Sequence, residues 1–392
     1  MAASRKKYSL RNRVALLRSG ERYFEVLLRM IADARQEFHL QTYILEPDTT
    51  GRLVLEALIA AAARGVAVYI QLDAYGSGKL DDTLLSDLRS KGIRIRKYGR
   101  LISRGKLHLG RRMHHKITVI DNHTALVGGI NISDNYSGWN GKPPWLDYAV
   151  VVQGETARQL NRICRKRWKD PDPQHELPSR ESDRVPFEGL SANDRVPVRI
   201  TQNDFLRRKQ ETAASYRQAI RQARNSLVFV GGYFLPGGLA RRLLKKAARR
   251  GVAISLIVSA ESDVGVVRNS RRYLYGWLLR NGIRIFEYHP SNVHGKLLLK
   301  DNSFVSIGSY DLNNLSTYSN IELNLDIRDL EFSEIVRSEL EAVVAGSCHE
   351  VTRTQHGQEG IFRKFVDWAS YQLVKTLFIL SVWLANRDDR DI

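Results

Sequence analysis

The chain has 392 residues, enough for two domains that each bury a core. With 43% hydrophobic and 9% aromatic residues, its composition is not that of a disordered chain. Its 61 basic and 42 acidic residues give a net charge of +19, which favours a polyanionic partner without distinguishing nucleic acid from an anionic membrane surface or a phosphate-bearing substrate.

The first twenty residues are basic and lack an apolar stretch, so we expect no secretory signal peptide. The two cysteines, Cys164 and Cys348, are far apart and belong to no Cys-x-x-Cys pair. We therefore expect neither a disulfide framework nor a thiolate metal site, which suits a protein that faces the cytosol.

An internal duplication organises most of the chain. Residues 37–43 resemble residues 226–233, residues 61–68 resemble 246–254, and residues 92–98 resemble 282–288. In the second and third pairs a helix ends near a glycine and an apolar strand follows. Helices and strands therefore alternate in the same order twice, which predicts two α/β domains with parallel or mixed sheets flanked by helices.

A proline-rich segment separates the two copies. Residues 170–197 contain five of the ten prolines and many charges, a composition typical of a linker or a long surface excursion. We therefore predict a first domain at residues 1–169, a linker at 170–197, a second domain at 198–356 and a tail at 357–392.

The tail carries the most apolar stretch of the chain, residues 365–385, which Asp367, Gln372 and Lys375 interrupt. No stretch reaches the ~18 apolar residues that a spanning helix needs. The pattern fits an amphipathic helix lying in a membrane interface. A helix packed on the second domain has the same pattern, so both interpretations remain open.

Each copy contains the motif His-x-Lys-x4-Asp, shortly after its last matched strand. The first motif consists of His114, Lys116 and Asp121, followed by Gly128, Gly129 and Asn131. The second consists of His294, Lys296 and Asp301, followed by Gly308, Ser309 and Asp311. Two matches at equivalent places of a duplication are far less expected by chance than one.

The spacing of the motif has a physical basis. Residues two apart on a strand share a face, so His114 and Lys116 project together, and His115 points the other way, toward packing or solvent. A lysine is a point charge suited to a phosphate oxygen, and a histidine can serve as nucleophile, acid or base near neutral pH. The Asp-Asn pair that closes each motif predicts a turn, and the glycines allow close approach of a phosphate.

With these two motifs the chain resembles the phospholipase D superfamily, from about residue 43 to residue 345. Residues 111–116, 127–131, 247–252 and 287–288 make it most similar to bacterial cardiolipin synthases of the subtype without two N-terminal transmembrane helices. This resemblance implies two α/β/α sandwiches about a pseudo-twofold axis, with one active site at their interface. It also implies a phosphohistidine intermediate.

The resemblance assigns roles residue by residue. One histidine attacks phosphorus and the other serves as acid and then base; we assign attack to His114 and acid–base work to His294, with the reverse left open. The lysines would hold phosphate oxygens and the motif aspartates would support the site. The expected catalytic set is His114, Lys116, Asp121, His294, Lys296 and Asp301. Residues expected to contact substrate or to orient the histidines are Asn131, Ser309, Asp147 and Glu322.

The chain departs from the family pattern in three places. Asp311 stands where asparagine is usual, and a carboxylate beside a phosphate is unfavourable unless it points away or is protonated. Gly129 stands where serine is common. Before His114, residues 99–112 form a basic insertion, which could be a membrane-facing rim or a solvated loop.

The function implied is transfer of a phosphatidyl group between two phosphatidylglycerol molecules, giving cardiolipin and glycerol. The alternative is the same chemistry with water as acceptor, in a lipid hydrolase or a nuclease, which the charge fits equally well. The apolar tail favours a lipid substrate, and the sequence lacks the aromatic pattern of a protein that stacks on nucleic-acid bases. The presence of two complete motifs disfavours an inactive scaffold. We expect a phospholipid substrate, an anionic membrane surface as partner, no cofactor or metal, and a peripheral position on the cytoplasmic face of the cell membrane.

Overall fold

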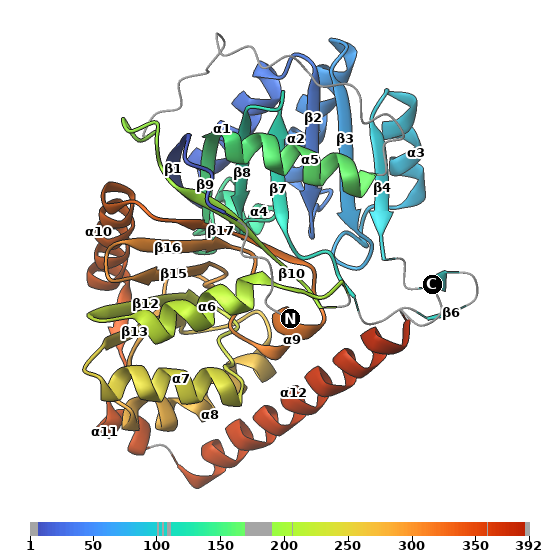
Figure 1. The fold of residues 1–392 in the computed structure, drawn as a ribbon. Coiled ribbons are helices and arrows are strands. Elements are labelled where there is room, and N and C mark those ends of the chain that lie inside the picture. Colours follow the sequence, from blue (N-terminus) through green and yellow to red (C-terminus); the bar gives the residue numbers. More distant parts are fainter. Residues whose placement is uncertain are drawn as a thin grey trace.

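The computed structural model describes residues 7–99, 102–103, 106–107, 111–168, 190–205, 207–358 and 360–388 (Figure 1). For residues 102–103, 106–107 and 381–388 it describes the backbone only. The described chain forms two halves, each built on a large mixed sheet.

The first half has a seven-stranded sheet in the order β1-β9-β8-β7-β2-β3-β4. Its strands are β1 (Asn12–Arg18), β2 (Glu37–Thr42), β3 (Ala67–Asp73), β4 (Arg94–Tyr98), β7 (Lys116–Ile120), β8 (Thr124–Gly128) and β9 (Tyr148–Gly154). Its helices are α1 (Glu21–Asp33), α2 (Thr49–Ala63), α3 (Asp82–Ser90), α4 (Asp134–Ser137) and α5 (Glu155–Trp168). A separate hairpin pairs β5 (Ile102–Ser103) with β6 (Lys106–Leu107).

The second half has a nine-stranded sheet in the order β11-β10-β17-β16-β15-β12-β13-β14-β18. Its strands are β10 (Val198–Asp204), β11 (Lys209–Gln210), β12 (Ser226–Gly231), β13 (Ala253–Ser259), β14 (Arg284–Tyr288), β15 (Lys296–Lys300), β16 (Phe304–Gly308), β17 (Glu322–Ile327) and β18 (Cys348–Glu350). Its helices are α6 (Glu211–Gln222), α7 (Gly238–Arg249), α8 (Gly265–Arg280), α9 (Asn314–Tyr318) and α10 (Leu330–Ser347).

The predicted duplication is confirmed by the order of the strands. Taken in their order across the sheet, the seven strands of the first sheet correspond one by one to β10-β17-β16-β15-β12-β13-β14 of the second. The strands β2, β3 and β4 are parallel to one another, as are β12, β13 and β14, and the remaining neighbours are antiparallel. The sheets are therefore mixed, as the alternation of helices and strands predicts.

Three apolar clusters form the layers between sheets and helices. Helices α1, α2 and α3 cover one face of the first sheet, and α6, α7 and α8 cover one face of the second. The opposite faces of the two sheets share a single central cluster, which contains Val127, Val150, Ile307, Leu325 and, from α10, Leu340. The two predicted sandwiches are thus fused through one continuous core.

The turns that end both motifs have the predicted sharp geometry. Asp121 and Asn122 have φ values of 46° and 61°, and Asp301 and Asn302 have 49° and 47°. Two successive residues with positive φ are the signature of a type I′ hairpin turn, which joins β7 to β8 and β15 to β16.

The part of the predicted linker that the structure describes lies along the first sheet, and residues 170–189 lie outside the described part. The backbone N–H groups of Ser191 and Val196 donate to the carbonyls of Val14 and Asn12. Residues 191–196 therefore belong to the packed structure rather than to a free connection.

The tail forms α11 (Arg353–Gly357) and the long helix α12 (Ile361–Asp388), which runs along α8 on the outside of the second half (Figure 1). Asp367, Ser370 and Val374 on its inner face are buried. Among the described residues no helix is both long and apolar enough to cross a membrane.

Candidate active site

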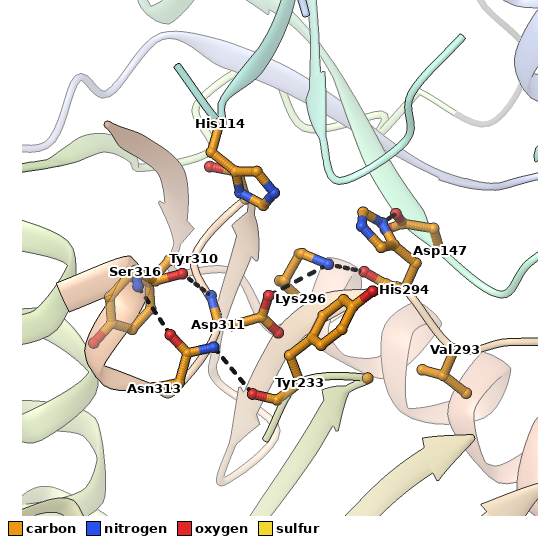
Figure 2. A network of polar contacts seen from close by, with 12 residues as sticks. His114, Asp147, Tyr233, Val293, His294, Lys296, Tyr310, Asp311, Asn313 and Ser316 are labelled. Atoms are coloured by element: carbon orange, nitrogen blue, oxygen red, sulfur yellow. Dashed lines mark hydrogen bonds and ion pairs between the residues drawn. The ribbon is translucent and has the colours of Figure 1, made fainter. Parts of the chain in front are cut away.

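The two motif histidines lie where the two halves meet. His114 comes two residues before the start of β7, and His294 two residues before the start of β15. Figure 2 shows the two imidazoles on either side of Lys296, with the Asp311 carboxylate beside it. One site is therefore assembled from two equivalent loops.

Backbone pairing between the halves holds each histidine loop. Met113 forms a parallel bridge with Ile321, and the His114 N–H donates to the Ile321 carbonyl over 3.0 Å. Equivalently, Val293 bridges to Leu146, whose carbonyl accepts from the His294 N–H over 2.8 Å. Each loop is thus fixed by a segment of the other half.

The residues after those two segments supply the carboxylates that orient the histidines. His294 Nδ1 lies 2.6 Å from Asp147 Oδ2, and His114 Nδ1 lies 3.0 Å from Glu322 Oε2. Asp147 comes from the first half and Glu322 from the second, so each carboxylate serves the histidine of the opposite half. The Nε2 atoms are left for chemistry.

The two histidine–carboxylate pairs differ in electrostatics. Burial lowers the pKa of His294 well below 6.5, with the positive charges of Lys296, Lys116 and His114 adding to the effect. Burial also raises the pKa of Asp147 to about 7. Burial works against ionisation of Glu322 too, but the charge of His114 and hydrogen bonds from His114 and Ser309 outweigh it and lower the pKa of Glu322.

Both lysines point into the same buried region. Lys116 Nζ donates to the His114 carbonyl over 2.5 Å, and Lys296 Nζ donates to the His294 carbonyl. Burial and the positive charge of Lys296 together lower the pKa of Lys116 to about 7. Two buried amines that repel each other favour an anion between them.

Two tyrosines complete the half-sites, and the sequence reasoning did not assign them to the site. The Tyr43 ring lies 5.0 Å from the His114 ring and 5.2 Å from Lys116 Nζ. The Tyr233 ring lies 6.2 Å from the His294 ring and 5.7 Å from Lys296 Nζ. Their equivalence was visible in the sequence, because the matched segments 37–43 and 226–233 both end in tyrosine.

Asn131 and Ser309 are engaged with the protein. Asn131 Oδ1 accepts from the Ile44 N–H over 3.1 Å, and Nδ2 donates to the Tyr136 hydroxyl over 2.9 Å. Ser309 Oγ accepts from the Leu323 N–H over 3.1 Å, and its hydroxyl also bonds to Glu322. Their polar groups therefore support the walls of the site.

The substitution of glycine for serine at position 129 has a steric reason. A Cβ atom on Gly129 would lie 2.4 Å from Asp147 Oδ1. The first half therefore gives the space of that side chain to the carboxylate that orients His294, whereas the second half keeps Ser309 beside Glu322.

Asp121 and Asp301 lie at the far ends of their strands, away from the histidines. Asp121 accepts backbone N–H bonds from residues 35–37, and Asp301 accepts them from residues 224–226. These bonds tie each hairpin turn to the start of β2 or β12. Among the described residues, the hydrogen bonds of both aspartates are thus with a strand of their own half and not with a motif histidine or lysine.

Asp311 differs from its counterpart Asn131. Its side chain is buried, Oδ2 lies 3.5 Å from Lys296 Nζ, and Oδ1 has no hydrogen-bond partner among the described residues. Burial raises its pKa, although Lys296 and His114 oppose this. The carboxylate is directed at Lys296, so this lysine has an acidic partner within the site.

His115 does not belong to this arrangement. His115 is buried on the opposite face, where Nε2 lies 2.7 Å from Gln41 Oε1. Half of the basic insertion, including Arg100 and Arg104, lies outside the described residues. At its end, Arg111 forms an ion pair of 2.5 Å with the buried Asp204 of the second half.

The described residues offer imidazoles, amines and carboxylates for chemistry. Within that part of the chain no group of three or more His, Cys, Asp or Glu side chains has the geometry of a metal site. Two imidazoles held through Nδ1, on either side of the buried lysines, can divide a displacement at phosphorus between a nucleophile and an acid.

Comparison with known sequences gives a consistent result. The family model described as "Cardiolipin synthase, PLD-like domain" matches residues 27–168 and 216–344. Cardiolipin synthase B of Escherichia coli K12 is 33% identical over 356 residues, which cover 88% of this chain and 83% of that protein. Cardiolipin synthase A of Pseudomonas syringae pv. syringae is 30% identical over 337 residues, covering 84% of this chain and 68% of that protein.

Comparison with solved structures supports the fold. The crystal structure of phosphatidylserine synthase from Haemophilus influenzae Rd KW20 superposes with a TM-score of 0.72. The match covers 96% of this chain and 97% of that one at 12% sequence identity, so it shows a common fold.

Proposed function

Because the chain belongs to the cardiolipin synthase family of phospholipase-D-like enzymes, we propose that it transfers the phosphatidyl group of one phosphatidylglycerol to a second, forming cardiolipin and releasing glycerol. The observation that carries this proposal is the pair of histidines, each oriented by a carboxylate of the opposite half, across two buried lysines.

The chemistry divides into two displacements. In the first, the Nε2 atom of one histidine attacks phosphorus, the bond from phosphorus to the glycerol oxygen breaks, and the other histidine gives its proton to that oxygen. In the second, this histidine takes the proton of the acceptor hydroxyl, whose oxygen attacks phosphorus and breaks the phosphorus–nitrogen bond. The lysines stabilise negative charge on the phosphoryl oxygens in both steps.

The surroundings of the histidines support His294 as the nucleophile and His114 as the acid and base, the reverse of the assignment that the resemblance suggested. A nucleophile needs an unprotonated Nε2, and burial favours neutral His294. An acid must be held in place for proton transfer, and the Glu322 carboxylate, whose pKa is lowered, lies 3.0 Å from His114 Nδ1.

Lipid reaches the site from a membrane surface in this proposal. The outer face of α12 exposes Ile361, Phe362, Phe365, Trp368 and Leu377 to between 44% and 88%. An apolar helix face on a protein with a net charge of +19 fits the interface of an anionic bilayer. We therefore propose that α12 lies in the interface while its inner face stays packed on α8.

The test of the function is to incubate the protein with phosphatidylglycerol vesicles and to separate the lipid products by thin-layer chromatography. Cardiolipin with an equal amount of glycerol supports the proposal. Phosphatidic acid alone would assign a hydrolase, and cleavage of DNA without any lipid product would assign a nuclease. His294→Ala should abolish turnover of phosphatidylglycerol, and His114→Ala should lower it by about 10²- to 10⁴-fold.

A further inference from the structure

The loops that carry the histidines are held by the sheet of their own half as well as by the opposite half. Asp73 is the last residue of β3, and Ser259 is the last residue of β13. The two positions are equivalent, because Asp73 pairs with Tyr98 on β4 and Ser259 pairs with Tyr288 on β14.

Each of these side chains accepts a hydrogen bond from the backbone N–H of the residue that precedes a histidine. Asp73 Oδ2 accepts from the Met113 N–H over 2.9 Å, and Ser259 Oγ accepts from the Val293 N–H over 2.6 Å. Asp73 and Ser259 are 0% and 2% exposed. A buried polar group placed twice at the same point of a duplication, on the same backbone atom, indicates a purpose beyond filling space.

We propose that Asp73 and Ser259 are positioning residues that set where His114 and His294 stand relative to the phosphate. Each histidine loop is thus held by two backbone N–H groups, an arrangement that we call a clamp. The N–H of the residue before the histidine bonds to a side chain of its own sheet. The N–H of the histidine itself bonds to a carbonyl of the opposite half, that of Ile321 for His114 and that of Leu146 for His294. Neither Asp73 nor Ser259 belongs to the His-x-Lys-x4-Asp motifs.

The two clamps are chemically unequal. Asp73 Oδ1 also accepts from the N–H groups of Tyr75 and Gly76, so its carboxylate fixes the turn after β3 together with the His114 loop. Ser259 has one hydroxyl, which can also donate to the Val293 carbonyl over 3.4 Å. Loss of Ser259 should therefore act on the His294 loop alone, whereas loss of Asp73 should loosen two segments.

The experiment compares Ser259→Ala and Asp73→Asn with the wild-type protein by the release of glycerol from phosphatidylglycerol. We expect kcat to fall on the order of 10- to 100-fold, because a shift of about 1 Å in a reacting group costs that much, while KM stays within about twofold. Ser259→Thr keeps the hydroxyl and should restore kcat. In protein with 15N-labelled histidine, Ser259→Ala should shift the His294 Nδ1 signal and leave that of His114 in place.

The matched controls are Ser215→Ala and Asp326→Asn, which remove a buried hydroxyl and a buried carboxylate bonded to each other over 2.6 Å, at the far end of β17 from Glu322. They should lower the thermal unfolding temperature without the fall in kcat. If they reduce kcat as much as their counterparts do at equal loss of stability, the role is merely structural and the proposal is wrong. A rise in KM at unchanged kcat, or a kcat within about twofold of wild type, also contradicts it.

This inference rests on the proposed function only through cleavage of the phosphodiester. Release of glycerol without formation of cardiolipin would refute the proposed synthase activity, but the effect of the two substitutions on kcat could still be measured. A wild-type protein that releases no glycerol would refute the function before either variant is compared.

Discussion

At the scale of single residues, the two halves give their histidines opposite settings. His294 is enclosed by the rings of Tyr136, Trp145 and Tyr233 at 5.4 to 6.2 Å, in a site where burial favours the neutral imidazole. His114 is more accessible, with 14% of its side chain exposed against 8% for His294. A duplicated sequence has thus produced two half-sites with different surroundings for their histidines.

The roles of the histidines can be separated with a substrate whose leaving group needs no proton. In a phosphatidyl ester of p-nitrophenol the departing phenolate is stable, so the acid becomes dispensable. His114→Ala should lose about 10²- to 10⁴-fold with phosphatidylglycerol, the usual contribution of general acid–base catalysis, yet release about one equivalent of p-nitrophenol in a burst. His294→Ala should release none. A burst from His294→Ala and none from His114→Ala would exchange the two roles.

Lys116 should couple substrate binding to pH. Its pKa of about 7 describes the site without an anion, and a bound phosphodiester favours the charged lysine and raises that pKa. Binding therefore takes up a proton above pH 7, so affinity should be constant below pH 7 and fall by up to about tenfold per pH unit above it. Calorimetry with a short-chain, soluble phosphatidylglycerol measures this, because a phosphodiester does not itself titrate there.

Lys116→Arg is the matched control for this effect, since a guanidinium stays charged throughout the range. It should bind the same lipid with an affinity that is flat between pH 7 and pH 9. A wild-type affinity that is equally flat would show that Lys116 is charged before the substrate arrives.

At the scale of elements, local sequence patterns predicted the strands and turns well, but they did not predict which residues a given side chain contacts. The turns at Asp121 and Asp301 follow from an Asp-Asn pair between apolar strands, which is local information. The internal bonds of Asn131 to Ile44 and Tyr136 do not, because nothing in its motif shows which neighbours the fold brings to its amide. The contacts of Asn131 within the protein therefore depend on long-range information, and its contact with substrate stays a prediction.

Helix α12 packs on α8 with one face and exposes apolar side chains on the other, so packing of the tail is observed and its place in a membrane interface is our proposal. Its inner face packs on α8, with Asp367 near Arg272 and Arg363, and Tyr371 lies 4.8 Å from Tyr273. Its outer face carries the exposed apolar side chains. The same pattern of apolar and polar positions was compatible with packing and with a membrane interface, and the helix has a separate face for each.

Charged substitutions on the outer face of α12 should separate membrane binding from catalysis. Phe362→Asp with Phe365→Asp removes two exposed aromatic side chains, each worth about 1.5–3 kcal/mol when fully buried. Partial burial in the interface makes a 10- to 100-fold loss of binding to phosphatidylglycerol vesicles the expected result, measured by sedimentation. Turnover of a short-chain, soluble phosphatidylglycerol should be unchanged.

Leu330→Asp is the matched control, because Leu330 on α10 is 72% exposed and lies outside the apolar face of α12. It should leave vesicle binding intact. Point substitutions are preferable to deletion of residues 357–392, since deletion would uncover the face of α8 that α12 covers. Equal loss of binding in Leu330→Asp would point to unfolding or to a general effect of charge.

At the scale of the whole molecule, the crossed pairing of histidines and carboxylates is the feature that the sequence could not specify. Glu322 and Asp147 were expected to orient the histidines, but His114 and Glu322 are 208 residues apart, and no spacing indicates which carboxylate serves which histidine. The pairing arises because Met113 bridges to Ile321 and Val293 to Leu146 once the halves are packed. Each half alone therefore holds a histidine without its carboxylate.

The shared central core predicts that the covalent connection between the halves is dispensable once they are folded. Val127 and Val150 of the first sheet pack in one cluster with Ile307 and Leu325 of the second, and the Ser9 N–H donates to the Val198 carbonyl across the halves. A protease site can be introduced between residues 169 and 189 and then cleaved. The two fragments should elute together in gel filtration and keep turnover within about twofold of the uncut protein. The reason is that a desolvated apolar interface of this kind behaves as a domain core cut in half.

The same cleaved protein should unfold in urea as one transition, with loss of activity and loss of tryptophan fluorescence superimposed, since neither half keeps a complete central core without the other. Two separate transitions, or fragments that part in gel filtration while each stays folded, would show that the central core is an ordinary contact between independent domains. The crossed carboxylates would then depend on the linker to bring them together, and cleavage should abolish turnover. Activity that survives cleavage and disappears in step with a single unfolding transition ties the site to the core that joins the two sheets.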